Sequence, residues 1–200
     1  MEVIVSVGLM LLAYVLGSLT PGVWIARARG VDIRKVGSGN IGSTNVYRTL
    51  GFFPGAIVQL LDISKAMIGV ALAQWLHLPL FMQYLTATAA VMGHIYPIWG
   101  GFRGGKGINT LLGGMLLIEP WTALAAVGTF LGVLAVSRIV SVSSIVAVAS
   151  FLLWHPILGG GTVEGIVAGL FWVGLVVYTH RANIARLRAG TEPRLGASKS

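Results

Sequence analysis

The sequence predicts an all-α integral membrane protein. Of its 200 residues, 56% are hydrophobic and only 10% are charged, whereas a soluble domain carries roughly 25% charged residues. The mean hydropathy is +0.85, which leaves too little polar surface for a water-soluble enzyme of this size. The same hydrophobicity excludes an intrinsically disordered chain. The chain contains no cysteine, so disulfides and thiolate chemistry are excluded as well.

Seven apolar runs predict seven transmembrane helices, one of them short. The first run, residues 3–25, contains no charge and is long enough to cross ~30 Å of hydrocarbon. Glu2 precedes it instead of a basic residue, and its length exceeds the roughly 7–15 residues of a signal-peptide core, so we expect a retained helix. The fourth run is too short for an ordinary span, so we expect it to be tilted or partly interfacial. The six runs after the first cover 52–76, 79–99, 108–118 (the short fourth run), 121–137, 142–158 and 163–179, and a basic tail follows.

Basic residues decide between seven spans and six, the number obtained if the fourth and fifth runs are merged. Seven spans place 13 of the 14 Lys and Arg residues on one side, the exception being Lys65 inside the second span. The opposite side then carries no Lys or Arg. By the positive-inside rule, the N-terminus is expected outside and the C-terminus in the cytoplasm. Both polar, glycine-rich loops and the tail therefore belong to the cytoplasmic face.

The first loop, residues 37–48, interleaves glycine with small polar residues. It satisfies G-x-G-x-x-G, but no strand precedes it, so a dinucleotide-binding fold is rejected. Gly37 and Gly39 let backbone N–H groups approach an anion, and Arg48 offers a fork suited to phosphate. A flexible interhelical loop with basic flanks is the alternative. Neutral hydrogen-bonding side chains are supplied by Ser38, Asn40, Thr44 and Asn45.

The second loop, residues 93–107, satisfies G-x-x-x-x-G-K in its second half. Gly107 stands where a Walker A loop has the Ser or Thr that holds magnesium, and no strand precedes it, so a nucleotide site is rejected. A similar arrangement of Gly105, Lys106 and Gly107 around a phosphate is expected at the N-terminus of the fourth run. His94, near the end of the third run, is either a base or a structural histidine.

Other polar residues lie within or beside the apolar runs. Asp62 and Lys65 are neighbours on one helical face, and each costs about 2.5–3.5 kcal/mol at a helix centre if unpaired. They are expected to face the interior, paired, with either a functional role or a structural one that orders the loops. Ser141 lies near the cytoplasmic plane, where it could also cap a helix. His180 and Asn183 share a face if the last helix continues into the tail.

Three spaced motifs resemble the PlsY family of bacterial membrane acylphosphate:glycerol-3-phosphate acyltransferases. They are G-S-G-N-x-G-x-T-N-x-x-R at 37–48, G-H-x-Y-P…G-G-K-G at 93–107 and H-R-x-N-I-x-R-L-x-x-G-x-E at 180–192. The likeness covers nearly the whole chain. It implies that a fatty acyl group passes from acyl phosphate to the sn-1 hydroxyl of glycerol-3-phosphate, giving lysophosphatidic acid and inorganic phosphate in phospholipid synthesis. It also implies a location in the bacterial inner membrane with a cytoplasmic active face, and no metal or cofactor.

The resemblance and the loop chemistry together suggest roles for the candidate residues. An acyl phosphate has a good leaving group, so no strong nucleophile is needed, in agreement with a chain that lacks cysteine and G-x-S-x-G. The phosphate oxygens and the leaving phosphate are expected to be held by Gly37, Gly39, Gly105, Gly107, Arg48, Lys106 and Ser141. Glycerol-3-phosphate is expected to be positioned by Ser38, Asn40, Thr44, Asn45, His180 and Asn183. Further binding candidates are Asp62, Lys65 and His94. The proton acceptor is His180 or the phosphate of the substrate itself.

Two other functions fit parts of the sequence. An organophosphate or anion transporter, or a transporter subunit, would suit basic loops and an intramembrane Asp–Lys pair, but the polar groups gather on one face instead of at the midplane. An acyl-CoA-dependent enzyme would need features for adenine recognition that the sequence lacks. The expected partners are the two substrates, membrane lipid and a soluble enzyme that produces acyl phosphate, with no nucleic acid. We expect residues 1–196 to form a single membrane domain and 197–200 an unstructured end.

Overall fold

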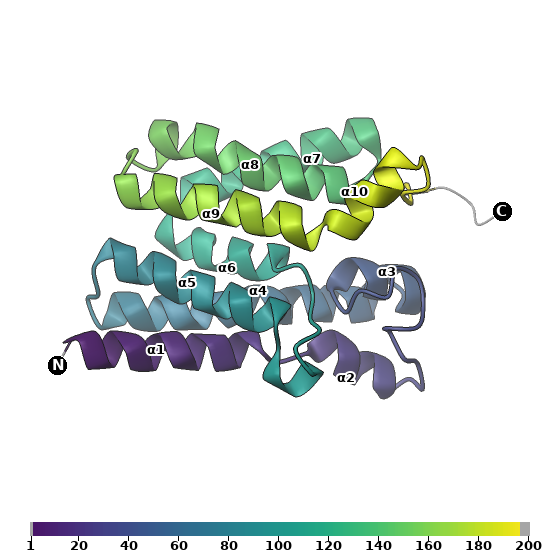
Figure 1. Ribbon diagram of the computed structural model, residues 1–200, viewed down its shortest axis with the longest axis horizontal. Helices are drawn as coiled ribbons and strands as arrows, with labels where there is room; N and C mark the ends of the chain where they lie inside the picture. The colour runs from purple at the N-terminus through teal and green to yellow at the C-terminus, as the bar shows by residue number, and fades with distance from the viewer. Residues whose placement is uncertain (1, 197–200) are drawn as a thin grey trace. The chain divides into compact units, whose positions relative to one another are not determined.

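A computed structural model describes residues 2–196, and this part of the chain is helical without any β-strand (Figure 1). The chain forms two compact units, which are described separately. Unit 1 ends at Ile118 and unit 2 begins at Glu119. The all-helical prediction is therefore confirmed. The predicted grouping of 1–196 into one domain stays a prediction, and the predicted unstructured end at 197–200 lies outside the described residues.

The first apolar run is divided into two helices, α1 (Glu2–Gly17) and α2 (Pro21–Arg27). Pro21 has no backbone N–H to donate and has its φ fixed near the helical value, so it begins a new helix more readily than it continues one. The prediction of one uninterrupted helix is therefore wrong. The segment Val3–Arg27 as a whole is nonetheless long and apolar enough to cross a membrane.

Unit 1 is built around α4 (Phe52–Trp75), which packs against α1, α5 (Leu80–Ile95) and α6 (Ile108–Ile118). Helix α5 packs against α1 as well. Glycines allow the helices to approach closely: a Cβ at Gly113 of α6 would overlap the backbone carbonyl of Ile63 in α4. This is the small-residue packing that holds helices together where the surrounding lipid is as apolar as the side chains.

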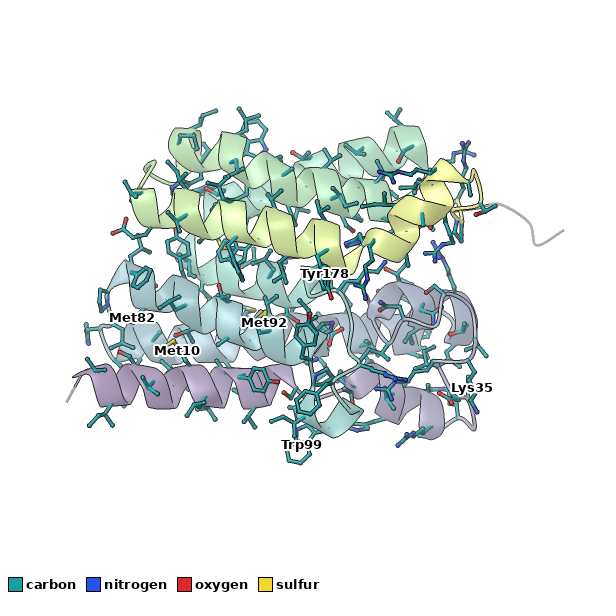
Figure 2. The ribbon with its side chains drawn as sticks, in the orientation of Figure 1. Met10, Lys35, Met82, Met92, Trp99 and Tyr178 are labelled. Carbon is teal, nitrogen blue, oxygen red and sulfur yellow. The ribbon has the colours of Figure 1, made fainter. Side chains whose placement is uncertain are left out.

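Two loops meet at one end of unit 1 (Figure 1). The first, residues 28–42, leads into α3 (Ser43–Leu50), and the second, residues 96–107, contains the short 3₁₀ helix η1 (Ile98–Gly100). Helix α5 ends at Ile95, sooner than the predicted run of 79–99, because Pro97 follows and disfavours helical geometry in the residue before it. Figure 2 shows Trp99 projecting outward from η1.

Unit 2 contains α7 (Pro120–Ser137), α8 (Val140–Leu158), α9 (Val163–Thr179) and α10 (Arg181–Arg188). Helix α8 packs against both α7 and α9. The predicted continuation of the last helix into the tail is interrupted at His180, where α9 and α10 meet at an angle of 60°. The tail is helical, but it leaves the axis of α9.

Within the described residues, four segments are long and apolar enough to cross a membrane, or five if the bent pair α9–α10 counts as one span. Helix α6 has 11 residues, in agreement with the short fourth run. Helix α5 has 16 residues, fewer than the ~20 expected of a span. The predicted total of seven spans and the predicted orientation stay predictions. The four segments are Val3–Arg27, Phe52–Trp75, Pro120–Ser137 and Val140–Leu158.

Candidate functional site

The first glycine loop is folded around the side chain of Asn45 in the first turn of α3. Its Oδ1 accepts a hydrogen bond of 2.9 Å from the N–H of Ser38. Its Nδ2 lies within 3.2 Å of three backbone carbonyls, those of Ile33, Val36 and Asn40. The residue is 1% exposed. Asn45 was expected to position glycerol-3-phosphate directly, but the structure commits its amide to the loop itself.

The glycines of this loop are required by its backbone. Gly37 and Gly39 have φ values of 59° and 70°, a region that residues with a Cβ rarely adopt. A Cβ at Gly37 would also overlap Oδ1 of Asn45. The neighbouring turn is closed by Asn40, whose Oδ1 accepts from the N–H of Gly42 at 2.8 Å. The loop therefore has a defined shape, contrary to the alternative of a flexible linker.

Arg34 joins the two loops. Its Nη2 donates to the carbonyls of Gly100 and Arg103, both at 2.9 Å. A second link is made by Asn109 at the start of α6, whose Nδ2 donates to Oγ of Ser43 at 2.9 Å. Sequence analysis did not identify Arg34 or Asn109 as site residues, because nothing in the local pattern reveals partners that lie 66 to 69 residues away.

The second loop ends α5 and begins α6. The N–H groups of Gly104 and Gly105 donate to the carbonyls of Ile95 and His94, each at 3.0 Å. They satisfy carbonyls that the end of a helix leaves unpaired, so they do not point at an anion as the sequence had suggested for Gly105. The next N–H groups, those of residues 107–109, donate to no acceptor in the described part of the chain. They form the positive end of the α6 dipole.

Two basic side chains are candidates for phosphate contacts, one next to these N–H groups in the chain and one on α3. Lys106 directly precedes α6 and is half-buried. Arg48, in the last turn of α3, is exposed and makes no ion pair with the residues described. A helix N-terminus with a neighbouring lysine is a phosphate-binding arrangement, and a guanidinium adds bidentate recognition. Thr44 is half-buried and Ser38 is exposed on the first loop.

The intramembrane charges form a buried cluster. Nζ of Lys65 donates to Oδ1 of Asp62 at 2.7 Å and lies 3.2 Å from Nδ1 of His94. These side chains are 4%, 2% and 5% exposed, respectively. The predicted pairing of Asp62 with Lys65 inside the protein is confirmed. Sequence analysis did not foresee that His94, on α5, joins the pair.

In unit 2, the carboxylate of Glu192 accepts hydrogen bonds from two of the candidate residues. It accepts from Oγ of Ser141 at 2.7 Å, from Nδ2 of Asn183 at 2.5 Å and from Nε of Arg186 at 2.7 Å. Burial alone would raise the pKa of Glu192, but the hydrogen bonds from Asn183, Ser141 and Arg186 and the charge of Arg186 outweigh it and lower that pKa below its ordinary value. Glu192 was the last letter of the third motif and was not proposed as a site residue.

His180 lies at the bend between α9 and α10 and is 2% exposed. Its Nδ1 is 2.8 Å from the carbonyl oxygen of Val176. Because a carbonyl only accepts, Nδ1 carries the hydrogen and, in the neutral ring, Nε2 carries the lone pair. The ring is therefore held in the tautomer whose Nε2 can accept a proton.

A second buried polar cluster in unit 2 was not foreseen. His155, 0% exposed, places Nδ1 3.0 Å from the carboxylate of Glu119 and Nε2 3.0 Å from the carbonyl of Thr162. Phe151 stacks on its ring. Neither this cluster nor any other part of the described chain groups three His, Cys, Asp or Glu side chains as a metal site would.

Comparison with known proteins identifies the family of this chain. Residues 7–190 match the sequence profile of the family described as glycerol-3-phosphate acyltransferase. The chain belongs to this family. Curated members include a protein of Thermosynechococcus vestitus, 42% identical over 100% of both chains, and one of Thermus thermophilus, 45% identical over 96% of both. Each is named glycerol-3-phosphate acyltransferase.

Solved structures of the family agree. The chain resembles a crystal structure of PlsY described as an integral membrane glycerol 3-phosphate acyltransferase in the glycerol 3-phosphate form, with a TM-score of 0.91, 39% identity and 96% of each chain covered. A lysophosphatidic acid form of PlsY matches with a TM-score of 0.88 and 38% identity. The resemblance expected from the three motifs is thus confirmed. The chain is a membrane glycerol-3-phosphate acyltransferase, and phospholipid biosynthesis follows from the family.

Proposed function

We propose that this acyltransferase uses acyl phosphate as its donor and forms lysophosphatidic acid and inorganic phosphate. The observation that carries the proposal is the end of unit 1, where Arg34 fastens two glycine loops together beside Lys106. The N–H groups of residues 107–109 follow, and they donate to no acceptor among residues 2–196. Both proposed substrates carry a phosphate, and such a group is what this end of the protein is suited to bind. The glycerol 3-phosphate and lysophosphatidic acid named for the solved relatives are the corresponding substrate and product.

The proposed step exchanges one carbon–oxygen bond for another. The sn-1 hydroxyl oxygen attacks the carbonyl carbon of the acyl phosphate, the bond from that carbon to the phosphate oxygen breaks, and inorganic phosphate leaves. Negative charge accumulates on the leaving phosphate, and preorganised donors stabilise it. We assign this stabilisation to Lys106, the N–H groups of residues 107–109 and Arg48. Gly37 and Gly39 shape the first loop, which carries Ser38 and Thr44 as candidate contacts for glycerol-3-phosphate.

In unit 2, the proposed substrate contacts are Ser141, Asn183 and His180. Glu192 orients the first two by accepting hydrogen bonds from Oγ and Nδ2. That leaves the lone pairs of the Ser141 hydroxyl as acceptors and directs both groups in a fixed way. The contact of Nδ1 with the carbonyl of Val176 puts the lone pair of the neutral His180 ring on Nε2.

The proton released by the attacking hydroxyl goes either to Nε2 of His180 or to a phosphate oxygen of the substrate. The two routes give different kinetics. If the phosphate accepts it, His180→Ala raises KM and leaves the shape of the kcat–pH profile intact. If His180 accepts it, the variant loses the limb of that profile near pH 6–7, where an imidazole ordinarily titrates, while KM stays constant.

We further propose that the loops of unit 1 and the basic tail face the cytoplasm of a bacterial inner membrane. The support is the charge distribution, with 13 of 14 Lys and Arg residues on one predicted side. A cytoplasmic donor site suits supply by a soluble enzyme that makes acyl phosphate, because that compound is a hydrolysable mixed anhydride.

Substitution of the two basic residues tests the proposal. Purified protein in lipid is given labelled glycerol-3-phosphate and palmitoyl phosphate, and labelled lysophosphatidic acid is counted. Lys106→Ala and Arg48→Ala should each lose more than about tenfold activity, since each removes a charge-assisted contact. Arg188→Ala, an exposed change in α10, is the control and should be mild. Near-wild-type turnover by folded Lys106→Ala would refute the phosphate site, and label entering sealed vesicles without product would favour a transporter.

A further inference from the structure

The buried cluster of Asp62, Lys65 and His94 lies directly beneath the second glycine loop. His94 belongs to the last turn of α5, and its own carbonyl accepts the N–H of Gly105 at 3.0 Å. The same glycine rests on the edge of the imidazole: a Cβ at residue 105 would overlap Nε2. The next residue is Lys106. The imidazole ring therefore supports the loop backbone at Gly105, directly before Lys106.

The cluster fixes the orientation of this ring. Nζ of Lys65 lies 3.2 Å from Nδ1 of His94. The same Nδ1 lies 3.5 Å from Oδ1 of Asp62, so both members of the ion pair face this nitrogen, and the opposite edge of the ring, with Nε2, is turned toward Gly105. Oδ1 of Asp62, 2.7 Å from Nζ, accepts a hydrogen bond from Lys65 and orients it. On α4 and α5, no other ionisable side chain pairs with this cluster in the described part of the chain.

Stability alone gives little reason for charges at this place. Replacing a buried ion pair by apolar residues of similar volume is often neutral or stabilising. An apolar pair, however, would offer no polar partner to Nδ1 of His94, and the imidazole would be free to turn. What the charges supply is one orientation of the ring, and with it one position of the loop that rests on it.

We propose that His94 is a positioning residue for acyl transfer, held in one orientation by Lys65 and Asp62, and that its Nε2 edge supports Gly105 and so places Lys106 against the phosphate. The inference rests on the proposed function and replaces the expectation that these three side chains touch substrate. We expect a large effect on the rate of acyl transfer, because a displacement of about 1 Å in a positioned group can cost on the order of 100-fold in rate.

Two substitutions at His94 separate the two nitrogens. In His94→Asn, the amide reaches the place of Nδ1, so the partner of Lys65 is retained while the support under Gly105 is lost. In His94→Gln, the longer side chain reaches the place of Nε2 and fills the space under the loop. We expect kcat/KM with palmitoyl phosphate to fall between about 10- and 100-fold in His94→Asn and to stay within about threefold of the wild type in His94→Gln.

A second readout follows the loop without any substrate. Hydrogen exchange of the segment 103–109, measured by mass spectrometry on the full-length protein in lipid, should be faster in His94→Asn and near wild-type in His94→Gln. A merely structural histidine would lower the melting temperature of both variants alike and affect both activities alike. Equal effects of the two variants, or a fully active His94→Asn with unchanged exchange, would overturn the proposal.

Gly105→Ala tests the same contact from the other side and serves if His94→Asn does not fold. Its added methyl should displace the loop, speed exchange in 103–109 and lower kcat/KM at least about tenfold. In the His94→Asn background, the ring edge is gone, so Gly105→Ala should add little further loss. A wild-type-like Gly105→Ala, or losses that multiply in the double variant, would contradict the proposal.

If the wild type forms no lysophosphatidic acid, the proposed function fails, whereas the exchange data still decide whether His94 supports the loop.

Discussion

Asn45→Asp should unfold the first glycine loop although it changes the side chain by a single atom. The amide nitrogen of Asn45 faces three backbone carbonyl oxygens at 2.9–3.2 Å. A carboxylate oxygen at that place accepts hydrogen bonds but donates none, so the bonds are lost and like charges face one another. The NH2 group has two hydrogens to share among these carbonyls, and a hydrogen bond contributes about 1 kcal/mol net, so the amide nitrogen contributes about 2 kcal/mol to the local stability of the loop. If all of this stabilisation is needed for catalysis, its loss corresponds to a decrease on the order of 30-fold in kcat/KM.

The assay combines hydrogen exchange of residues 30–45 with steady-state kinetics. Asn40→Asp is the matched control: only Oδ1 of Asn40 is used, as acceptor for the N–H of Gly42, and an aspartate keeps that acceptor. Exchange in the loop should rise strongly in Asn45→Asp and stay near wild-type in Asn40→Asp. Equal protection in the two variants would refute the reasoning that the amide of Asn45 holds the loop together.

Three other predictions follow from the buried contacts. Arg34→Ala should weaken the junction of the two loops by about 2 kcal/mol and speed hydrogen exchange in both, whereas Arg29→Ala, exposed on the surface, should not. The stability that Glu192 contributes to unit 2 should be present above its ordinary pKa of 4.5 and lost as the pH falls through its lower folded pKa, because the unfolded carboxyl binds the proton more tightly. Glu192→Gln should remove this pH dependence of the melting temperature. His155→Ala should destabilise the protein by about 3–5 kcal/mol, as truncation of a large buried ring does, because His155 is fully buried and stacked on Phe151, and an unchanged melting temperature would contradict that.

Helix positions could be predicted from the sequence because they follow from apolar length and from proline. The run 108–118 is the helix Ile108–Ile118, and the run 52–76 differs from α4 by one residue. The break before Pro21 and the early end of α5 before Pro97 escaped a hydropathy argument, although proline signals both. Hydropathy averages over a window, and a single missing N–H does not change the average.

The sequence predicted which residues belong to the candidate site, but not which partner each side chain contacts. Asn45 was expected to face the substrate and instead faces its own loop, since an amide bonds equally well to backbone and to ligand. Arg34 and Glu192 were missed because their value comes from partners distant in sequence, carbonyls 66 and 69 residues away and a hydroxyl 51 residues away. Such long-range contacts depend on the packing of helices, which no local pattern contains.

Donor identity is the central claim and can be measured directly. Purified protein in lipid, with a chelator present, is incubated with labelled glycerol-3-phosphate and either palmitoyl phosphate or palmitoyl-CoA. We expect labelled lysophosphatidic acid from palmitoyl phosphate alone. Product from palmitoyl-CoA alone would keep the family and the fold but contradict the proposed donor.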